Sequence, residues 1–122
     1  MKKFMTKNFS KWALKQNLEN QDLFLTISEI ENEQYEVNLG GGLYKKRIGF
    51  KGQGKSSSGR TIICYKKEDK AIFIHGFAKN EKSNLTKKEL MAFKDVSKFL
   101  LGLNLEQIKE AIETGKLIEV VL

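Results

Sequence analysis

The order of apolar and polar residues along the chain predicts helices on either side of a run of strands. Apolar residues recur at helical spacing after Ser10, a candidate N-cap for a helix that runs to Glu19. They recur again over residues 22–33, where acidic residues lie beside the apolar stripe. Strand patterns follow over residues 35–39, 43–50, 60–67 and 71–78. The turn at 67–70 is short, so the last two strands are expected to pair antiparallel within a meander.

Two capping boxes predict helices after the strands. Thr86 and Glu89 precede an apolar stripe that reaches Leu100, and Asn104 and Gln107 precede a second stripe that stops near Gly115. Residues 117–121 are expected to form a short closing strand or an extended tail. The pattern predicts an α+β fold, and 122 residues with 40% hydrophobic content suit one domain over residues 1–122.

Positive charge is concentrated in one part of the chain. Residues 43–79 hold ten Lys or Arg against two acids, a net +8, whereas the other 85 residues hold twelve bases and thirteen acids. A focused positive surface is typical of proteins that bind phosphate, most often in nucleic acid. The alternative for each cation is a solvated strand face that aids solubility.

The remaining composition indicates a soluble cytoplasmic protein without a metal site. Apolar runs are far shorter than the roughly 20 residues of a membrane span, and the basic start lacks the apolar stretch of a secretory signal. The lone Cys64 lies in an apolar strand pattern and is expected to be a buried structural residue. One Cys and one His form no zinc set.

One segment matches the sequence pattern of a nucleotide-binding loop but lacks the structural context of that loop. Residues 49–56 match G-x-x-x-x-G-K-[ST], but Lys55 is followed by Ser-Ser-Ser-Gly and then a strand. A phosphate-binding loop of this kind needs a helix that begins at the Lys. We therefore expect no nucleotide cofactor, and a hairpin loop whose Lys51 and Lys55 follow an RNA backbone.

Strand alternation divides the basic residues between two faces. Lys45 and Arg47 share one face, whereas Tyr44, Lys46 and Ile48 share the other. The apolar face must turn toward the helices, so Lys45 and Arg47 are expected to point away from that core. Arg60 is expected to join them from the neighbouring strand, and the mid-strand His75 is assigned a structural role.

Three segments resemble the RelE/ParE superfamily of bacterial toxins, in its RelE-like branch with HigB-type and phage-related members. They are Leu-Gly-Gly-Gly-Leu-Tyr-Lys-Lys-Arg-Ile at 39–48, Gly-Lys-Ser-Ser-Ser-Gly-Arg-Thr-Ile-Ile at 54–63, and Phe-Ile-His-Gly-Phe-Ala-Lys-Asn-Glu-Lys-Ser-Asn at 73–84. The resemblance implies a small antiparallel sheet, mixed at its edge, packed against N-terminal helices and followed by one or two C-terminal helices.

The resemblance also implies a function and its residues. RelE-like toxins are translation-dependent endoribonucleases that cut messenger RNA on the ribosome without a metal or other cofactor. Matched by motif, the catalytic residues would be Lys45, Arg47, Arg60 and Lys79, with Lys45 and Lys79 as candidates for acid or base. The RNA-binding residues would be Lys46, Lys51, Lys55 and Asn80. The stretch 82–85 lacks the tyrosine found in RelE, so Tyr44 and Tyr65 are the alternatives for its role.

Two other functions fit the same residues, namely a ParE-like gyrase inhibitor and a noncatalytic RNA-binding domain or decayed toxin. The sequence has several of the basic site residues of RelE-like toxins, which favours the nuclease over the ParE-like gyrase inhibitor. The expected partners are the ribosome, messenger RNA and a cognate antitoxin that presents an acidic or apolar segment, often joined to a DNA-binding domain.

Overall fold

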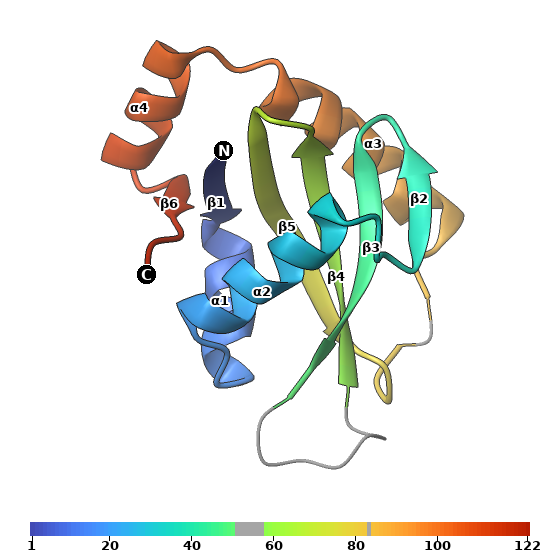
Figure 1. Cartoon of the computed structure of the whole chain (residues 1–122). Coiled ribbons are helices and arrows are strands. Elements are labelled where there is room, and N and C mark those ends of the chain that lie inside the picture. Colours follow the sequence, from blue (N-terminus) through green and yellow to red (C-terminus); the bar gives the residue numbers. More distant parts are fainter. Residues whose placement is uncertain (51–57, 83) are drawn as a thin grey trace.

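The computed structural model describes residues 1–50, 58–82 and 84–122. Its helices are α1 (Lys7–Lys15), α2 (Asn20–Glu31), α3 (Lys87–Leu101) and α4 (Leu105–Glu113) (Figure 1). Its strands are β1 (Lys2–Thr6), β2 (Val37–Gly40), β3 (Leu43–Gly49), β4 (Ser58–Lys66), β5 (Lys70–Ala78) and β6 (Leu117–Glu119). Most of the motif at 49–56 lies outside the described residues, and so do Lys51 and Lys55. The next described element after the motif is the strand β4, which begins at Ser58.

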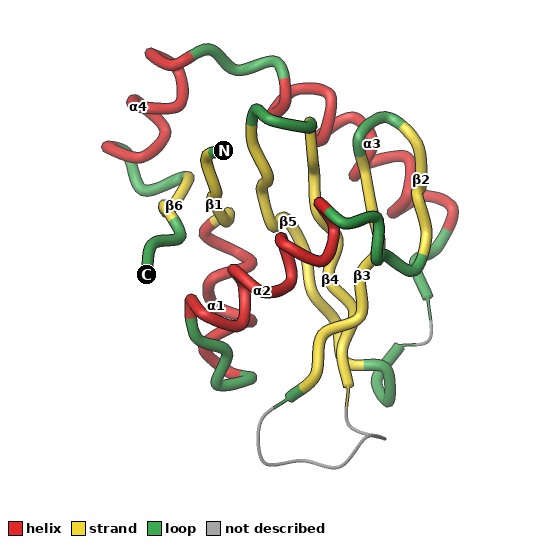
Figure 2. Tube along the Cα trace, viewed as in Figure 1, coloured by secondary structure: helices red, strands yellow, loops and turns green. Residues whose placement is uncertain are grey.

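The described strands form one mixed sheet in the order β2-β3-β4-β5-β1-β6 (Figure 2). Four of the five neighbouring pairs are antiparallel, and the pair of β1 and β5 is parallel. The predicted meander of β3, β4 and β5 is confirmed, and with it the α+β class. Within the described ranges, no helix is long and apolar enough to span a membrane.

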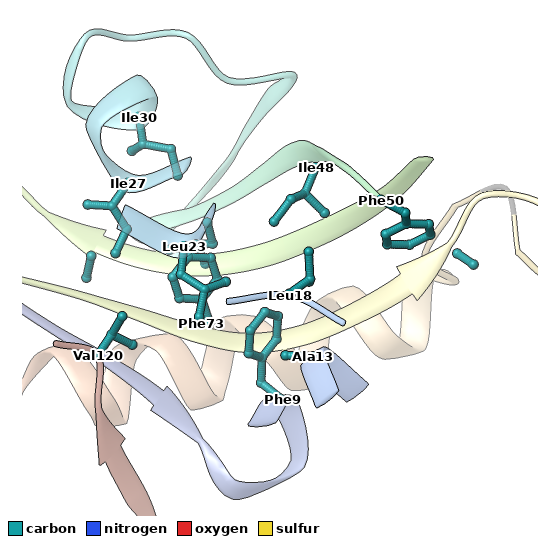
Figure 3. Close-up of a cluster of buried hydrophobic side chains, with 13 residues drawn as sticks. Phe9, Ala13, Leu18, Leu23, Ile27, Ile30, Ile48, Phe50, Phe73 and Val120 are labelled. Carbon is teal, nitrogen blue, oxygen red and sulfur yellow. The ribbon is translucent and has the colours of Figure 1, made fainter. Parts of the chain in front are cut away.

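Both faces of the sheet carry a core, because β4 and β5 are apolar on both sides. On the face covered by α1 and α2, here the α2 face, Phe73 stacks on Phe9 of α1 with ring centroids 4.8 Å apart (Figure 3). On the opposite face, here the α3 face, side chains of α3 and α4 complete a second core. Its buried members are Phe4, Leu43, Ile62, Cys64, Ile72, Ile74, Phe77, Leu100, Ile108 and Leu117.

The start of the chain differs from the sequence prediction. Residues 2–6 form β1 between β5 and β6, and Thr6 caps α1 by accepting a hydrogen bond from the Phe9 amide at 3.2 Å. Ser10 is therefore inside the helix, where its hydroxyl donates to the Lys7 carbonyl at 2.7 Å. The helix expected from Ser10 to Glu19 instead ends at Lys15. A strand of five residues whose partners lie more than sixty residues away has little local signal.

The two capping boxes are confirmed. The Thr86 hydroxyl accepts from the Glu89 amide at 3.1 Å while the Glu89 carboxylate accepts from the Thr86 amide at 2.8 Å. Asn104 and Gln107 form the same reciprocal pair, with both distances at 2.9 Å. Each box satisfies two of the backbone donors that a helix start leaves free. The short closing strand is also confirmed as β6.

A β-bulge in β5 changes which residues face which core. Ile62 lies opposite His75 and the next residue, Ile63, lies opposite Phe73, so β5 has one extra residue at this point. Such a bulge shifts the alternation of side chains beyond it. His75 consequently turns to the α3 face, and Gly76 turns to Trp12 on the α2 face.

Replacing Gly76 by Ala should destabilise the protein, because the added methyl group would overlap the indole ring of Trp12. Overpacking of this kind costs about 1–3 kcal/mol. The matched control is Gly49→Ala, where a methyl group would meet no atom of the described residues within 4 Å. Urea unfolding should show a lower midpoint for Gly76→Ala than for Gly49→Ala, and equal midpoints would show that Trp12 does not require the glycine.

Candidate functional site

Three predicted cationic residues lie together on the α3 face, toward the end of the sheet where β3 finishes and β4 begins. Arg47 and Arg60 are direct partners across β3 and β4, and Lys45 is two residues along β3 on the same face. Like charges directly opposite each other in a sheet are destabilising. The site therefore needs a compensating negative group.

Arg60 is the most buried of these cations, with 5% of the residue exposed. Its Nε donates a hydrogen bond to Oε2 of Glu36 at 2.8 Å, and Nη1 donates to the Gly59 carbonyl at 3.3 Å. A buried charge is tolerated only where a partner and further hydrogen bonds replace water. The guanidinium is thus held in one orientation by its own strand and by Glu36.

Glu36 is a site residue that the sequence analysis missed. Its Oε2 lies 3.8 Å from Nζ of Lys45 as well as beside Arg60, so one carboxylate lies between two cations. It immediately precedes β2, where Val37 pairs with Lys45 and the Glu36 amide donates to the Lys45 carbonyl at 2.9 Å. Only the register of β2 on β3 could have located it.

The loop between β5 and α3 supplies a neutral partner. Nζ of Lys45 donates to Oδ1 of Asn84 at 3.1 Å, and the same oxygen accepts from the Leu85 amide at 2.9 Å. Asn80, the loop residue predicted to bind RNA, is exposed after β5. The contact to the cation cluster therefore comes from Asn84, four residues further on.

Arg47 and Lys79 are exposed. Arg47 is placed beside Arg60 by the strand register, and the Lys79 amide donates to the Ser58 carbonyl at 3.1 Å just beyond β5. Lys79 therefore lies at the same end of the sheet, two strands away from Arg47. We call Lys45, Arg47, Arg60, Lys79 and Glu36 the cation site.

Lys46 does not lie in the cation site. It alternates to the α2 face, where its Nζ is 3.2 Å from Oε1 of Glu29. Tyr44 and Tyr65 pack against the core of the same face, so neither replaces the missing tyrosine of the RelE pattern within the cation site. The prediction that they do so is wrong, because side chains of adjacent strand residues point to opposite faces.

His75 borders the cation site beside α3. Its ring centroid is 4.9 Å from that of Phe93. Ile62 on β4 lies between Lys45 on β3 and His75 on β5 and pairs with both. Burial lowers the pKa of His75, with Glu89 raising it and Lys82 lowering it. Glu89 and Lys82 form an ion pair, and that hydrogen bond is the main reason that the pKa of Glu89 falls to about 2. His75 is therefore neutral at physiological pH, with Glu89 ionised nearby.

Cys64 behaves as the sequence predicted. It is fully buried, and burial raises the pKa of its thiol to about 11, so it is protonated and unreactive at neutral pH. Among the described residues, no group of three or more His, Cys, Asp or Glu side chains could hold a metal ion.

The fold and the cation site define a small α+β protein with Lys and Arg side chains grouped at one end of its sheet. The sequence model of the family described as "RelE toxin of RelE / RelB toxin-antitoxin system" matches residues 1–120. The chain therefore belongs to the RelE toxin family, within the RelE/ParE superfamily of type II toxins. No curated protein matches it. Family membership implies a cognate antitoxin as partner.

The charges around His75 can be tested by nuclear magnetic resonance, because the chain has one histidine. The pKa of His75 should lie below 6.5, and Glu89→Gln should lower it further by removing the negative charge that favours the imidazolium. Glutamine preserves the capping box at the start of α3. Glu110→Gln on α4 is the control, and an unchanged titration midpoint of His75 in Glu89→Gln would contradict the charge interaction with Glu89.

Proposed function

We propose that this toxin is a ribosome-dependent endoribonuclease that cuts messenger RNA. The observation that carries the proposal is the carboxylate of Glu36 between Lys45 and Arg60, with Arg47 directly opposite Arg60 on the neighbouring strand. Fixed cations stabilise the charge that develops on a phosphate under attack, and a carboxylate beside two of them can accept a proton.

The reaction uses the 2′-hydroxyl of the RNA as nucleophile. Its oxygen forms a bond to the adjacent phosphorus, the bond from phosphorus to the 5′-oxygen breaks, and the products are a 2′,3′-cyclic phosphate and a 5′-hydroxyl. Arg47 stabilises the phosphoryl oxygens directly, because its exposed guanidinium presents a planar fork of donors, and the buried Arg60 contributes its positive charge behind it. Each such donor contributes roughly 10² to 10³ in rate.

Glu36 takes the proton of the 2′-hydroxyl, and Lys45 or Lys79 gives a proton to the departing 5′-oxygen. Arg60 holds the carboxylate in place through Nε, which leaves the outer edge of Glu36 toward solvent. The sequence analysis assigned both proton transfers to lysines because it saw no carboxylate near the cations. The proximity of Glu36 to Arg60 and Lys45 supports it as the acceptor in this proposal.

The ribosome and messenger RNA as partners, and the cytoplasm as compartment, are proposed from the family resemblance. Lys51, Lys55 and Asn80 would extend the RNA path beyond the cation site, and the whole range 1–122 would act as one domain. Lys46 stays a predicted RNA contact, with the ion pair to Glu29 on the α2 face against it.

Lys45→Ala and Arg47→Ala should each reduce cleavage of ribosome-bound messenger by roughly 10² to 10³, because each removes a cation from the phosphate site. The measurement is mapping of RNA ends in a purified translation system containing EDTA-treated toxin. Lys66→Ala, which removes the same charge at the far turn of the β4–β5 hairpin, is the control. Wild-type cleavage by both site variants would contradict the proposal, and gyrase-linked DNA breaks without RNA cleavage would indicate the ParE-like alternative.

Glu36→Gln tests the proton acceptor separately from binding. Glutamine can still accept the hydrogen bond from Arg60, but it is a poor base, so cleavage should fall by roughly 10² to 10⁴ while RNA affinity is kept or increased. Single-turnover cleavage and RNA binding at fixed salt give the two readouts. Unchanged cleavage would move the base to His75, Lys45 or Lys79.

A further inference from the structure

A cavity on the α2 face, remote from the cation site, is walled by every tyrosine of the chain. It has a volume of about 540 Å³ and lies where α2 ends, lined by Ile30, Glu31, Asn32, Glu33, Tyr35, Tyr44, Tyr65 and Lys67. The centroids of Tyr35 and Tyr44 are 4.9 Å apart with rings inclined by 60°, and those of Tyr44 and Tyr65 are 5.7 Å apart at 69°. We call it the tyrosine cavity.

All three rings line the cavity, so a guest that enters it meets aromatic side chains on several sides. All three are half-buried, and among the described residues none of their hydroxyls forms a hydrogen bond within the chain. Each π face carries partial negative charge, which attracts a cation placed over it. Three tyrosine rings around one opening resemble the aromatic sites that bind organic cations.

The electrostatics of the tyrosine cavity are opposite to those of the cation site. Glu31 and Glu33 line it, and neither has an ion-pair partner in the ranges 1–50, 58–82 and 84–122. The carboxyl end of α2 adds the partial negative charge of a helix C-terminus. Burial raises the pKa of Tyr44, and the negative charge of Glu33 raises it further. Lys67 is the single cation in the lining.

These charges distinguish between the two kinds of ligand that clustered tyrosines commonly bind, organic cations and the bases of nucleic acid. Tyrosines also stack on the bases of single-stranded nucleic acid, but such sites follow the phosphates with positive charge. Here two carboxylates and a helix C-terminus would repel a phosphate. A cation gains from the rings, the carboxylates and the helix end together.

We propose that the tyrosine cavity binds an organic cation, a guanidinium or alkylated ammonium group, between Tyr35, Tyr44 and Tyr65. The group is either a basic side chain presented by another polypeptide or a free small molecule of the same chemistry. The site does not depend on RNA cleavage, because it lies on the other face of the sheet and shares no residue with the cation site.

The experiment is a titration of protein carrying isotope-labelled tyrosine, in which every labelled signal reports on this cavity. The probes are tetramethylammonium chloride, a short arginine-containing peptide with blocked ends, sodium chloride and uridine monophosphate. The two organic cations should shift the tyrosine ring signals saturably, whereas sodium chloride should not. Tighter binding of the peptide identifies a polypeptide source, and tighter binding of tetramethylammonium identifies a free small cation.

Variants locate the binding. Tyr44→Leu should weaken probe binding roughly tenfold, Tyr44→Phe should retain it because the ring face remains, and Glu33→Gln should weaken it several-fold. Phe24→Leu, which removes a ring on α2 that pairs with Lys3 outside the cavity, is the control. Absence of saturable shifts with both cations, equal shifts with uridine monophosphate, or full binding by Tyr44→Leu would each overturn the proposal.

Discussion

The pairing of buried Arg60 with Glu36 is the constraint on which the arrangement of the site depends. Arg60, with 5% of the residue exposed, has lost most of its water, so a carboxylate must reach its guanidinium from elsewhere in the fold. That carboxylate precedes β2, a four-residue edge strand whose position is set by its ladder with β3. The outermost strand of the sheet thus brings a negative charge to a cation two strands away, and it brings Lys45 into the same contact.

The sheet also separates residues that are neighbours in sequence. Along Tyr44-Lys45-Lys46-Arg47, successive side chains point to opposite faces. Lys45 and Arg47 lie on the α3 face, whereas Tyr44 and Lys46, which pairs with Glu29, lie on the α2 face. One short segment therefore contributes to two surfaces of opposite character. The first is the proposed site for an anion and the second the proposed site for a cation, although composition alone showed only a net positive segment.

Local patterns predicted the meander and both capping boxes, because alternation and capping are determined by residues close in sequence. They did not predict β1, whose stability comes from β5 and β6, nor the contacts of Glu36 and Asn84, which join residues 24 and 39 positions apart to their cations. The bulge at Ile62 and Ile63 explains the different orientation of His75. Strict alternation from Phe73 would place it on the α2 face, so its proximity to the cation site depends on one extra residue.

The +8 of residues 43–79 also overstates the charge available to a ligand. Lys70 is buried and its Nζ donates to the Leu103 carbonyl at 2.8 Å, where it fixes the connection between α3 and α4. Lys46 is neutralised by Glu29, and Arg60 shares Glu36 with Lys45. Arg47 and Lys79 are the exposed cations of the cation site. Much of the charge thus stabilises the fold, and what distinguishes the site is the fixed orientation of Arg60 and Lys45 rather than the number of bases around it.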